Sequence, residues 1–376
     1  MLSNMRYKIA VFPGDGVGPE LINEGIKIIE KAAELGKFNV EFVKYPHGAE
    51  HYAETKEILN EKILKEIKNS CNAIYCGTFG NEIKKFNDIP NFIKTYFDQF
   101  ASLRPIKLLP GAESAIAGKT ANEIDFVIIR ENTEDFCVGM CGKTKNNKNK
   151  QQFDISKSAF KAKFGIDIET KNELAYQIGV LSRKGCDRAV KFAFEYAKSR
   201  NKKKITAIDK SNMMEFYNFW RESIDNISKE YSDVEYEYEL IDAAVMNFIR
   251  QPEKYKIILA TNLFGDILGD LGTIMQGNLA FAARGNISPE GISMFEPVHG
   301  SAPQLKDKGI INPIATIWAG ALMLDIIGET KSGDLILKAI ESILKEGRTR
   351  TSDLDGSNTT SEMGDAIADK FVELHD

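Results

Sequence analysis

The sequence lacks a run of about 18 uncharged apolar residues, the length that a membrane-spanning helix requires. Its most apolar stretch, Ile311–Ile327, opens on Asn312-Pro313 and contains Asp325, and it predicts a buried helix instead. The N-terminal residues Met1–Ala10 are polar and mixed, unlike a signal peptide. We therefore expect no membrane partner and a cytoplasmic location.

Cysteine and histidine are scarce. The five cysteines include no C-x-x-C pair, and an odd number in a chain of 376 residues argues against a disulfide scaffold. The four histidines lie far from most of the cysteines along the chain, so we expect no structural zinc site.

An excess of positive charge is also lacking. Lysine and arginine number 49 against 54 aspartates and glutamates, which gives a net charge of −5. A general nucleic-acid binder needs a basic face, so we expect no nucleic-acid partner. The polar, basic segment Gly142–Lys150 predicts a mobile surface loop, with a nucleic-acid contact as the alternative.

The sequence does contain an alternation of short apolar runs with amphipathic helical patterns, which favours an α/β fold. Its length suggests two domains. Strands are expected at Tyr7–Pro13, Val40–Lys44, Ala73–Cys76, Asp125–Arg130, Lys204–Asp209, Tyr236–Ile241 and Lys256–Ala260. Helices are expected at Glu20–Leu35, Lys56–Lys68, Asn172–Arg200 and Met213–Glu230.

A glycine-rich turn, Gly14–Glu20, follows the first predicted strand and precedes a helix. A dinucleotide-binding turn takes that position, but here Pro19 replaces the third glycine of G-x-G-x-x-G. Two interpretations remain open, a nucleotide contact and a simple tight strand–helix connection.

Two aspartates stand alone in an otherwise uncharged segment. Between Ile257 and Ala283 the charged residues are Asp266 and Asp270, spaced i and i+4. On a helix this spacing places both carboxylates on one face, where they repel each other and lose hydration beside apolar neighbours. A divalent cation relieves both effects, and carboxylate oxygens suit Mg²⁺ or Mn²⁺. The alternative is a solvated helix face.

Polar residues also follow two predicted strands. Lys210 and Asn212 come directly after the strand that ends at Asp209, and Asp242 follows the next strand. Ligands of α/β proteins gather beyond the carboxyl ends of strands. Lys210 could therefore act as a base and Asp242 as a third metal ligand, although surface lysines are common.

Two further features suit a small anionic ligand. Phe295–Pro303 is rich in small residues that let a ligand approach the backbone. Arg104 and Arg130 each end an apparent strand, and paired arginines bind carboxylates with two hydrogen bonds each. The alternatives are a rigid two-proline loop and structural ion pairs.

Together these motifs resemble the isocitrate/isopropylmalate dehydrogenase family of metal-dependent β-decarboxylating dehydrogenases. The matching segments follow the family order along the whole chain. They are Gly14–Glu20, Leu103–Pro105, Arg130–Glu134, Asp209–Asn212, Asn262–Asp270, Phe295–Pro303 and Asn312-Pro313.

The resemblance implies two α/β domains that share a long mixed sheet, with the site in the cleft. The first, cofactor-binding domain would comprise residues 1–103 and 277–376. The second would comprise residues 104–276 and would form the dimer interface. In the family, the lysine matching Lys210 and the aspartate matching Asp242 come from the second subunit, so a homodimer with shared sites is implied.

The resemblance also implies oxidation and decarboxylation of a malate-type 2-hydroxy acid. Asp242, Asp266 and Asp270 would bind Mg²⁺ or Mn²⁺, and Lys210 would take the hydroxyl proton. Lys94, Arg104 and Arg130 would bind the substrate. The cofactor-binding residues would be Asn212, Glu296, His299, Gly300, Ser301, Ala302, Gln304, Leu305 and Asn312.

The chain departs from the family pattern at Cys137, where the family has a tyrosine that protonates the enol. A thiol, with an ordinary pKa of about 8.5, can donate a proton but is shorter than a phenol. Either Cys137 or a residue of the segment 138–171 would then supply the acid. We expect the hydride step to survive and the enol to be processed differently or slowly.

Lys94 replaces a usual arginine, and the preceding stretch Asp88–Ile93 matches neither the isopropylmalate nor the isocitrate pattern. Phe97–Phe100 and Ser211 lean toward the tartrate/malate branch. Gln304 and Leu305 occupy the positions that hold the adenosine ribose. They offer no cation for a 2′-phosphate, which favours NAD over NADP.

The sequence leaves three functions open. The first is an NAD- and metal-dependent decarboxylating dehydrogenase acting on 3-isopropylmalate or a tartrate/malate-like acid. The second is an isocitrate or homoisocitrate dehydrogenase. The third, suggested by Cys137 and Lys94, is a non-catalytic regulatory paralogue that pairs with an active subunit.

Overall fold

The structure is a computed structural model that describes residues 5–80, 89–144 and 147–375. The chain divides into two compact units. The first comprises Met1–Gln99, Leu103–Asp125 and Leu271–Asp376, and the second comprises Phe100–Ser102 and Phe126–Asp270.

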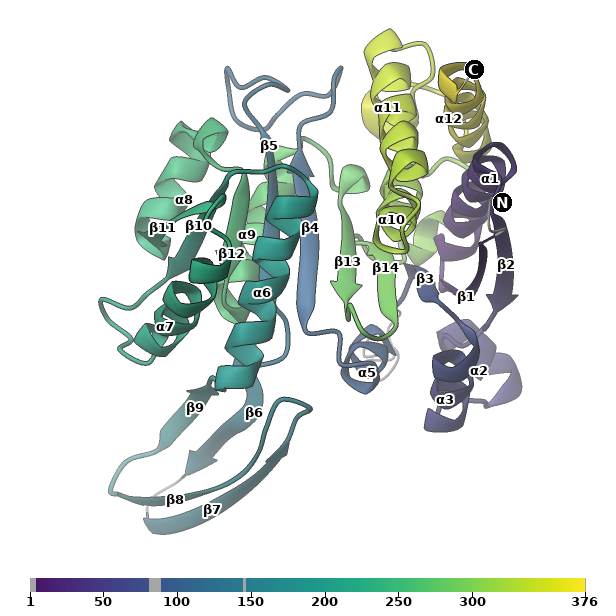
Figure 1. The fold of residues 1–376 in the computed structure, drawn as a ribbon. Helices are drawn as coiled ribbons and strands as arrows, with labels where there is room; N and C mark the ends of the chain where they lie inside the picture. The colour runs from purple at the N-terminus through teal and green to yellow at the C-terminus, as the bar shows by residue number, and fades with distance from the viewer. Residues whose placement is uncertain (1–4, 81–88, 145–146, 376) are drawn as a thin grey trace. The chain divides into compact units, whose positions relative to one another are not determined.

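A mixed sheet of ten strands forms the framework of the fold (Figure 1). The strand order is β11-β10-β12-β5-β4-β13-β14-β3-β1-β2. Strand β13 runs antiparallel to β14, whereas β1, β2 and β3 and also β5, β10, β11 and β12 pair in parallel. The predicted α/β class with a large mixed sheet is confirmed. The strands are β1 (Arg6–Gly14), β2 (Asn39–Lys44), β3 (Ala73–Thr78), β4 (Ala101–Lys107), β5 (Asp125–Glu131), β10 (Lys204–Asp209), β11 (Glu235–Leu240), β12 (Ile257–Ala260), β13 (Ala283–Ile287) and β14 (Ser293–Pro297).

In the first unit, helices cover both faces of the strands. On one face lie α1 (Gly18–Gly36) and α10 (Ile314–Ile326), and the hydroxyl of Tyr75 donates to the Thr316 carbonyl of α10 at 2.7 Å. Helices α11 (Thr330–Glu346) and α12 (Thr360–His375) pack beside them. The residues next to Tyr75, Ile74 and Cys76, point the opposite way because side chains alternate along a strand.

That opposite face carries a second core, to which α2 (Ala49–Thr55), α3 (Glu61–Ser70) and α5 (Ile89–Tyr96) contribute. Its buried side chains include Phe12, Ala49, Leu64, Ile74 and Ile93. Helix α10 is buried along nearly its whole length, as its sequence predicts. Among the helices of the described residues, none combines the length and apolar character needed to span a membrane.

In the second unit, three of the parallel strands, β10, β11 and β12, lead into helices, whereas β5 leads into strand β6. Helices α6 (Arg183–Ser199) and α7 (Tyr217–Ile227) lie side by side, and α6 packs on β10 and β12 (Figure 1). Helix α8 (Ile241–Arg250) follows β11 directly, and α9 (Asn262–Met275) begins two residues after β12. The starts of α8 and α9 therefore lie at the carboxyl ends of strands, where α/β proteins bind ligands.

A strand-built arm extends from this unit (Figure 1). Strands β6 (Asp135–Thr144) and β9 (Leu174–Val180) pair antiparallel, as do β7 (Asn147–Ser156) and β8 (Lys161–Thr170). The predicted loop Gly142–Lys150 is therefore wrong on both sides of residues 145–146, which lie outside the described residues. Long cross-strand ladders with β8 and β9 order this polar segment, a non-local effect that its composition does not reveal.

The predicted helix over Asn172–Arg200 is also wrong in its first part. Leu174–Val180 forms β9, and α6 begins only at Arg183, after the Ser182 hydroxyl accepts a hydrogen bond from the Gly185 amide at 3.0 Å. Two other helices start later than predicted. Helix α3 begins at Glu61 because Asn60 caps it, and α7 begins at Tyr217.

Candidate functional site

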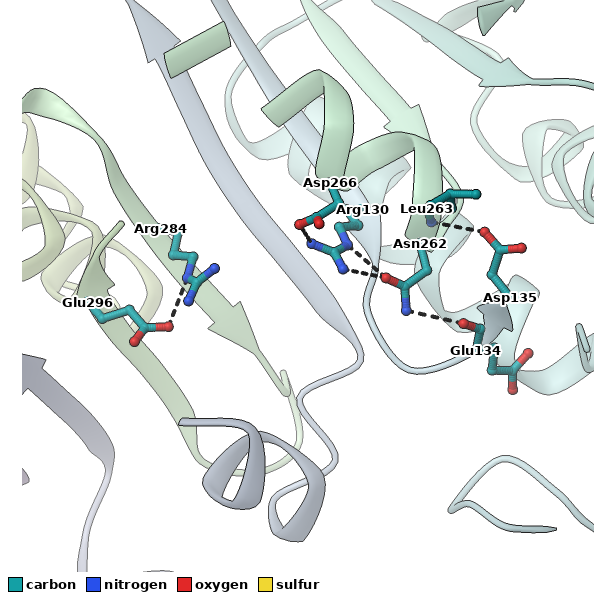
Figure 2. Close-up of polar contacts among 8 residues, drawn as sticks. All are labelled: Arg130, Glu134, Asp135, Asn262, Leu263, Asp266, Arg284 and Glu296. Carbon is teal, nitrogen blue, oxygen red and sulfur yellow. Dashed lines mark hydrogen bonds and ion pairs between the residues drawn. The ribbon is translucent and has the colours of Figure 1, made fainter. Parts of the chain in front are cut away.

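The end of β5 contacts the start of α9 through Arg130. Its Nε donates to Oδ1 of Asn262 at 2.9 Å, and its Nη1 contacts Asp266 one turn along the helix (Figure 2). Gly265 makes this approach possible, because a Cβ there would lie 2.7 Å from the Cβ of Arg130. The guanidinium is thus held flat against the first turn of α9.

A buried acidic segment continues from this contact. Nδ2 of Asn262 donates to the Glu134 carbonyl at 3.2 Å, and the Leu263 amide donates to Oδ2 of Asp135 at 2.9 Å (Figure 2). The Glu134 carboxylate accepts from the Ser182 amide at 2.7 Å and from its hydroxyl at 2.6 Å. Burial raises the pKa of both Glu134 and Asp135, whereas these hydrogen bonds lower it. The segment after β5 is therefore fixed to α6 and α9.

Glu131 is fully buried at the end of β5. Its carboxylate accepts from the amide and hydroxyl of Thr133, at 2.9 and 2.6 Å, and from the Glu134 amide at 2.8 Å. Burial is the largest influence and raises the pKa of Glu131 to about 7. The carboxylates of Glu131 and Glu134 thus stabilise the conformation of the segment after β5 by accepting hydrogen bonds. The sequence motif alone does not reveal this structural role.

Asp266 and Asp270 lie on successive turns of α9, and both are exposed. The predicted helix is confirmed, so the i, i+4 spacing does put the two carboxylates on one face. Asp242 does not join them within one chain. Among the described residues, the three carboxylates do not form a group whose ligand oxygens all lie within 4.8 Å of one another. One chain therefore offers two of the three expected oxygen ligands together.

Lys210 and Asp242 are brought together instead. They follow the neighbouring parallel strands β10 and β11, and the ammonium of Lys210 contacts the Asp242 carboxylate. This contact lowers the pKa of Asp242. The preceding Asp209 is buried and accepts from Nε of Arg221 at 2.6 Å and from the Ser211 amide at 2.9 Å. Asp209 therefore orders the turn that carries Lys210, while Asn212 beyond it is exposed.

The remaining candidates lie on three elements. Cys137 is exposed on β6, Lys94 is half-buried on α5, and Arg104 is buried on β4. Of the stretch Asp88–Ile93, Asp88 lies outside the described residues.

The first unit contains a cavity of about 410 Å³ beside the Phe295–Pro303 loop. Its lining includes Asn278, Leu279, His299, Leu305, Asn312 and Asp353. Nε2 of His299 is buried and has no hydrogen-bond partner within the described part of the chain. Burial lowers the pKa of His299, so its ring is neutral near pH 7. Apolar walls with an unpartnered imidazole nitrogen fit a flat, partly polar ligand such as a nucleobase.

Asp353 orders one end of this cavity. Its Oδ2 accepts from Nδ2 of Asn278 at 2.7 Å and from Nδ2 of Asn312 at 3.0 Å. The Asn312 side chain also accepts from the Ile314 amide at 3.0 Å, at the start of α10. Asn312 and Asp353, 41 residues apart in sequence, thus form one side of the cavity.

The glycine-rich turn supports the loop that lines this cavity. The Val17 amide donates to the Ser301 carbonyl at 2.9 Å, and a Cβ at Gly16 would lie 2.1 Å from that oxygen. Gly16 has φ +60°, which a side chain would further disfavour. The structure therefore gives the turn a close-packing role, the simpler of its two interpretations.

The other loop residues predicted to bind cofactor are distributed around this contact. Glu296 is buried in β14, and its Oε1 accepts from Nε of Arg284 at 2.8 Å (Figure 2). The same oxygen accepts from Nδ2 of Asn286 at 2.8 Å. Ser301 is buried, whereas Gly300 and Gln304 are exposed. Ala302 has φ +38° and precedes the short 3₁₀ turn Pro303–Leu305.

Three residues of these arrangements are missed by sequence reasoning. Asn262 lies within a quoted motif, but its bridge between Arg130 and Glu134 appears only in three dimensions. Asn278 and Asp353 carry no local pattern that marks them, because the cavity assembles from segments distant in sequence.

Comparison with solved structures defines the class of the fold. The chain is similar to an isocitrate dehydrogenase from Methylococcus capsulatus, with a TM-score of 0.80 and 30% identity over 97% of this chain and 99% of that chain. The family model "Isocitrate/isopropylmalate dehydrogenase" matches residues 8–367. The chain belongs to this family and is an enzyme, an oxidoreductase, as the resemblance implies.

Similar curated proteins include decarboxylating dehydrogenases of hydroxy acids. The chain is 35% identical to a D-malate dehydrogenase [decarboxylating] of Escherichia coli, over 98% of each chain. It is 34% identical to a tartrate dehydrogenase/decarboxylase of Pseudomonas putida, also over 98% of each chain. Two enzymes named for different acids are thus almost equally similar in sequence to this chain.

Proposed function

We propose that the protein oxidises and decarboxylates a malate-type 2-hydroxy acid, using NAD and Mg²⁺ or Mn²⁺. The names of the similar enzymes support the substrate class, and tartrate/malate-like acids are favoured over 3-isopropylmalate. The observation that carries the proposal is the position of Arg130 against Asp266 at the start of α9. An arginine beside paired aspartates offers a carboxylate-binding cation and metal-binding oxygens at one place.

Asp266 and Asp270, with Asp242 of a second copy, would hold the metal. When bound, such a cation polarises the substrate hydroxyl and stabilises negative charge on that oxygen. The hydroxyl proton would pass to Lys210, directly or through a water, while the hydride from the same carbon goes to the nicotinamide. Lys210 would accept this proton as the neutral amine, and Asp242, which it contacts in the single chain, would stabilise the ammonium that forms.

Arg104, Arg130 and Lys94 would bind the substrate carboxylates. Loss of the β-carboxylate as carbon dioxide leaves its bonding electrons on the remaining carbons as an enolate, which then needs a proton. The family tyrosine is absent, so the thiol of Cys137 or a residue of the arm would donate this proton. Cys137 is exposed on β6 and is therefore open to solvent exchange.

NAD is favoured as the cofactor. The cavity lined by Leu279, His299 and Leu305 would take the adenosine, and the carboxylate of Asp353 in its wall would repel a 2′-phosphate. Lys306 is the nearest cation after Gln304 in the sequence, and it is already paired with Glu50 at 2.5 Å. The loop residues Glu296, Gly300, Ser301 and Ala302 and also Asn212 would complete the nucleotide site.

The working unit would be a homodimer, because Lys210 and Asp242 would be supplied to the site of the second copy. The carboxylate separation within one chain supports this arrangement. All five cysteines are free, in keeping with a reducing, cytoplasmic setting.

The test is NADH absorbance with the pure protein, NAD or NADP, and Mg²⁺ or Mn²⁺. The substrates would be D-malate, L-malate, tartrate, 3-isopropylmalate, isocitrate and homoisocitrate. Turnover of a malate or tartrate with NAD supports the proposal. Turnover of isocitrate or homoisocitrate alone would instead identify the protein as an isocitrate or homoisocitrate dehydrogenase. If a folded dimer that binds NAD and Mn²⁺ forms no NADH with any of these acids, a regulatory subunit would be favoured.

A further inference from the structure

A group of three metal-ligating side chains lies around α2, in the first unit. His47 precedes the helix, His51 lies within it, and Glu57 follows its end. One ligand atom from each residue lies within 4.8 Å of the other two. The imidazole rings of His47 and His51 have centroids 5.2 Å apart, and Nε2 of His51 lies 3.2 Å from Oε2 of Glu57.

His47 shows a feature that an ordinary core histidine would not. Its side chain is buried, with 8% of the residue exposed, and its Nδ1 has no hydrogen-bond partner within the described part of the chain. A buried polar atom without a partner is unfavourable, and native structures contain few. Burial lowers the pKa of His47, and the neighbouring His51 lowers it further. A neutral imidazole retains the lone pair that a metal binds.

The surroundings leave the group accessible to an ion. The side chain of Glu57 is 68% exposed and that of His51 16% exposed, so solvent reaches two of the three ligands. Lys56, the adjacent cation, donates to the Ala53 carbonyl at 3.0 Å and lies 5.4 Å from the centre of the Tyr52 ring. Its ammonium is thus engaged by other groups.

We propose that His47, His51 and Glu57 form a binding site for a divalent transition metal of intermediate hardness, such as Zn²⁺. Two imidazoles and one carboxylate match the ligand set of zinc sites that keep a fourth position for water. Mg²⁺ and Mn²⁺ favour oxygen ligands and belong to the carboxylates of α9 instead. The expectation of no structural zinc site rested on the distance of the histidines from the cysteines, and the site proposed here contains no cysteine.

Metal binding would stabilise the position of α2 against the glycine-rich turn. The first turn of this helix already holds the glycine-rich turn, because Oδ1 of Asp15 accepts from the Ala49 amide at 2.7 Å and Oε1 of Glu50 accepts from the Gly16 amide at 3.1 Å. A metal would join His47, two residues before the helix, to Glu57, two residues after it. It would thereby stabilise the support of the Ser301 loop without entering the reaction.

The test is calorimetric titration of the chelator-treated protein with Zn²⁺, and visible absorbance with Co²⁺ as a probe of imidazole ligands. The background would be Asp266→Asn with Asp270→Asn, so that binding at α9 does not contribute. We expect one equivalent of Zn²⁺ in this background and at least about a hundredfold weaker binding after His51→Gln or Glu57→Gln. His375→Gln, an exposed histidine at the far end of α12, is the matched control.

Because His51 and Glu57 are partly exposed, these variants should fold, and circular dichroism would verify it. Zn²⁺ should also raise the Tm of the background protein but not that of His51→Gln. Saturable Zn²⁺ binding that His51→Gln and Glu57→Gln leave unchanged would overturn the site, as would the absence of any binding. Activity plays no part in these readouts, so the result is independent of the proposed function.

Discussion

Nε of Arg130 donates to Oδ1 of Asn262 at 2.9 Å, across 132 residues of sequence. The same amide donates through Nδ2 to the Glu134 carbonyl at 3.2 Å. One buried side chain thus joins the end of β5, the segment after it and the first turn of α9. The orientation of the Arg130 guanidinium depends on this amide.

Replacing this amide tests its importance. Asn262→Ala removes these two hydrogen bonds and a further contact of Oδ1 with Nη2 of Arg130, and it leaves a buried carbonyl without its donor. We therefore expect the free energy of unfolding to fall by ~1–3 kcal/mol. Urea unfolding measures the change, and Asn218→Ala, at an exposed position of α7, is the control. Substrate KM should rise as well, since Arg130 loses its orientation. Equal stabilities for the two variants would contradict this role.

The sequence predicts seven of the ten strands of the main sheet, because each of the seven has a clear local pattern, but it does not predict the ranges of β4, β13 and β14. It fails in the arm. Residues 142–144 and 147–150 look like a loop and 174–180 like part of a helix, yet all three segments form strands through pairing with partners distant in sequence. A polar strand has little local signal, since its stability comes from the cross-strand neighbours that it meets in the fold.

Glu131 should make stability depend on pH. Its pKa is about 7 in the folded chain against an ordinary 4.5, so between these values the native state retains a proton that the unfolded chain has lost. The stabilising contribution is therefore complete below pH 4.5 and is lost as the pH rises toward 7. At ~1.4 kcal/mol for each tenfold change in proton affinity, the loss is about 3 kcal/mol.

The measurement is the unfolding free energy of the wild type and of Glu131→Gln from pH 4.5 to 8. The wild type should lose stability relative to the variant as the pH rises. Glu235→Gln, an exposed glutamate of β11, should run parallel to the wild type. The opposite slope would mean that the three hydrogen bonds to the carboxylate outweigh its burial.

Asp270 provides the clearest test of the proposed metal site. Replacing Asp266 would also remove its contact with Arg130, so the variant chosen is Asp270→Asn, at an exposed position of α9. We expect the Mn²⁺ concentration for half-maximal activity to rise at least about tenfold, with stability changed by less than ~0.5 kcal/mol. Asp233→Asn is the control. Unchanged Mn²⁺ dependence would remove Asp270 from the site.

Sequence spacing finds the candidate site only in part. The spacing of Asp266 and Asp270 on α9 could be predicted, because a helix converts sequence separation into position on a face. The contact of Lys210 with Asp242 and the cavity beside Asp353 could not, because they depend on which strands become neighbours. His47, His51 and Glu57 illustrate the same limit, since the turn at Lys56, with φ +64°, brings Glu57 back toward His51.

Cofactor preference should respond to charge at Gln304. This residue is exposed in the 3₁₀ turn beside the cavity, and a lysine there would add a cation for a 2′-phosphate. We expect Gln304→Lys to lower the KM for NADP by roughly tenfold, the effect of about 1.4 kcal/mol, and to alter the KM for NAD little. Initial rates with both nucleotides measure this. The control is Lys308→Gln, which removes an exposed cation nearby in sequence. It should leave the ratio of the KM values for NADP and NAD unchanged.

Cys137 is a position at which a substitution should increase the catalytic rate rather than decrease it. If the enol lacks its usual phenolic acid, Cys137→Tyr restores a group of the right length, and general acid catalysis of this kind contributes ~10²–10⁴-fold when fully positioned. We expect kcat to rise at least about tenfold, because the exposed strand position admits a larger side chain without displacing the core. Cys141→Tyr, exposed four residues along the same strand, controls for an added aromatic ring on the arm. Release of carbon dioxide and formation of NADH should be followed together. A rise in kcat with tyrosine at 137 alone identifies enol protonation as slow in the natural chain. Equal or lower rates with every acid tried would mean that another residue already supplies the proton.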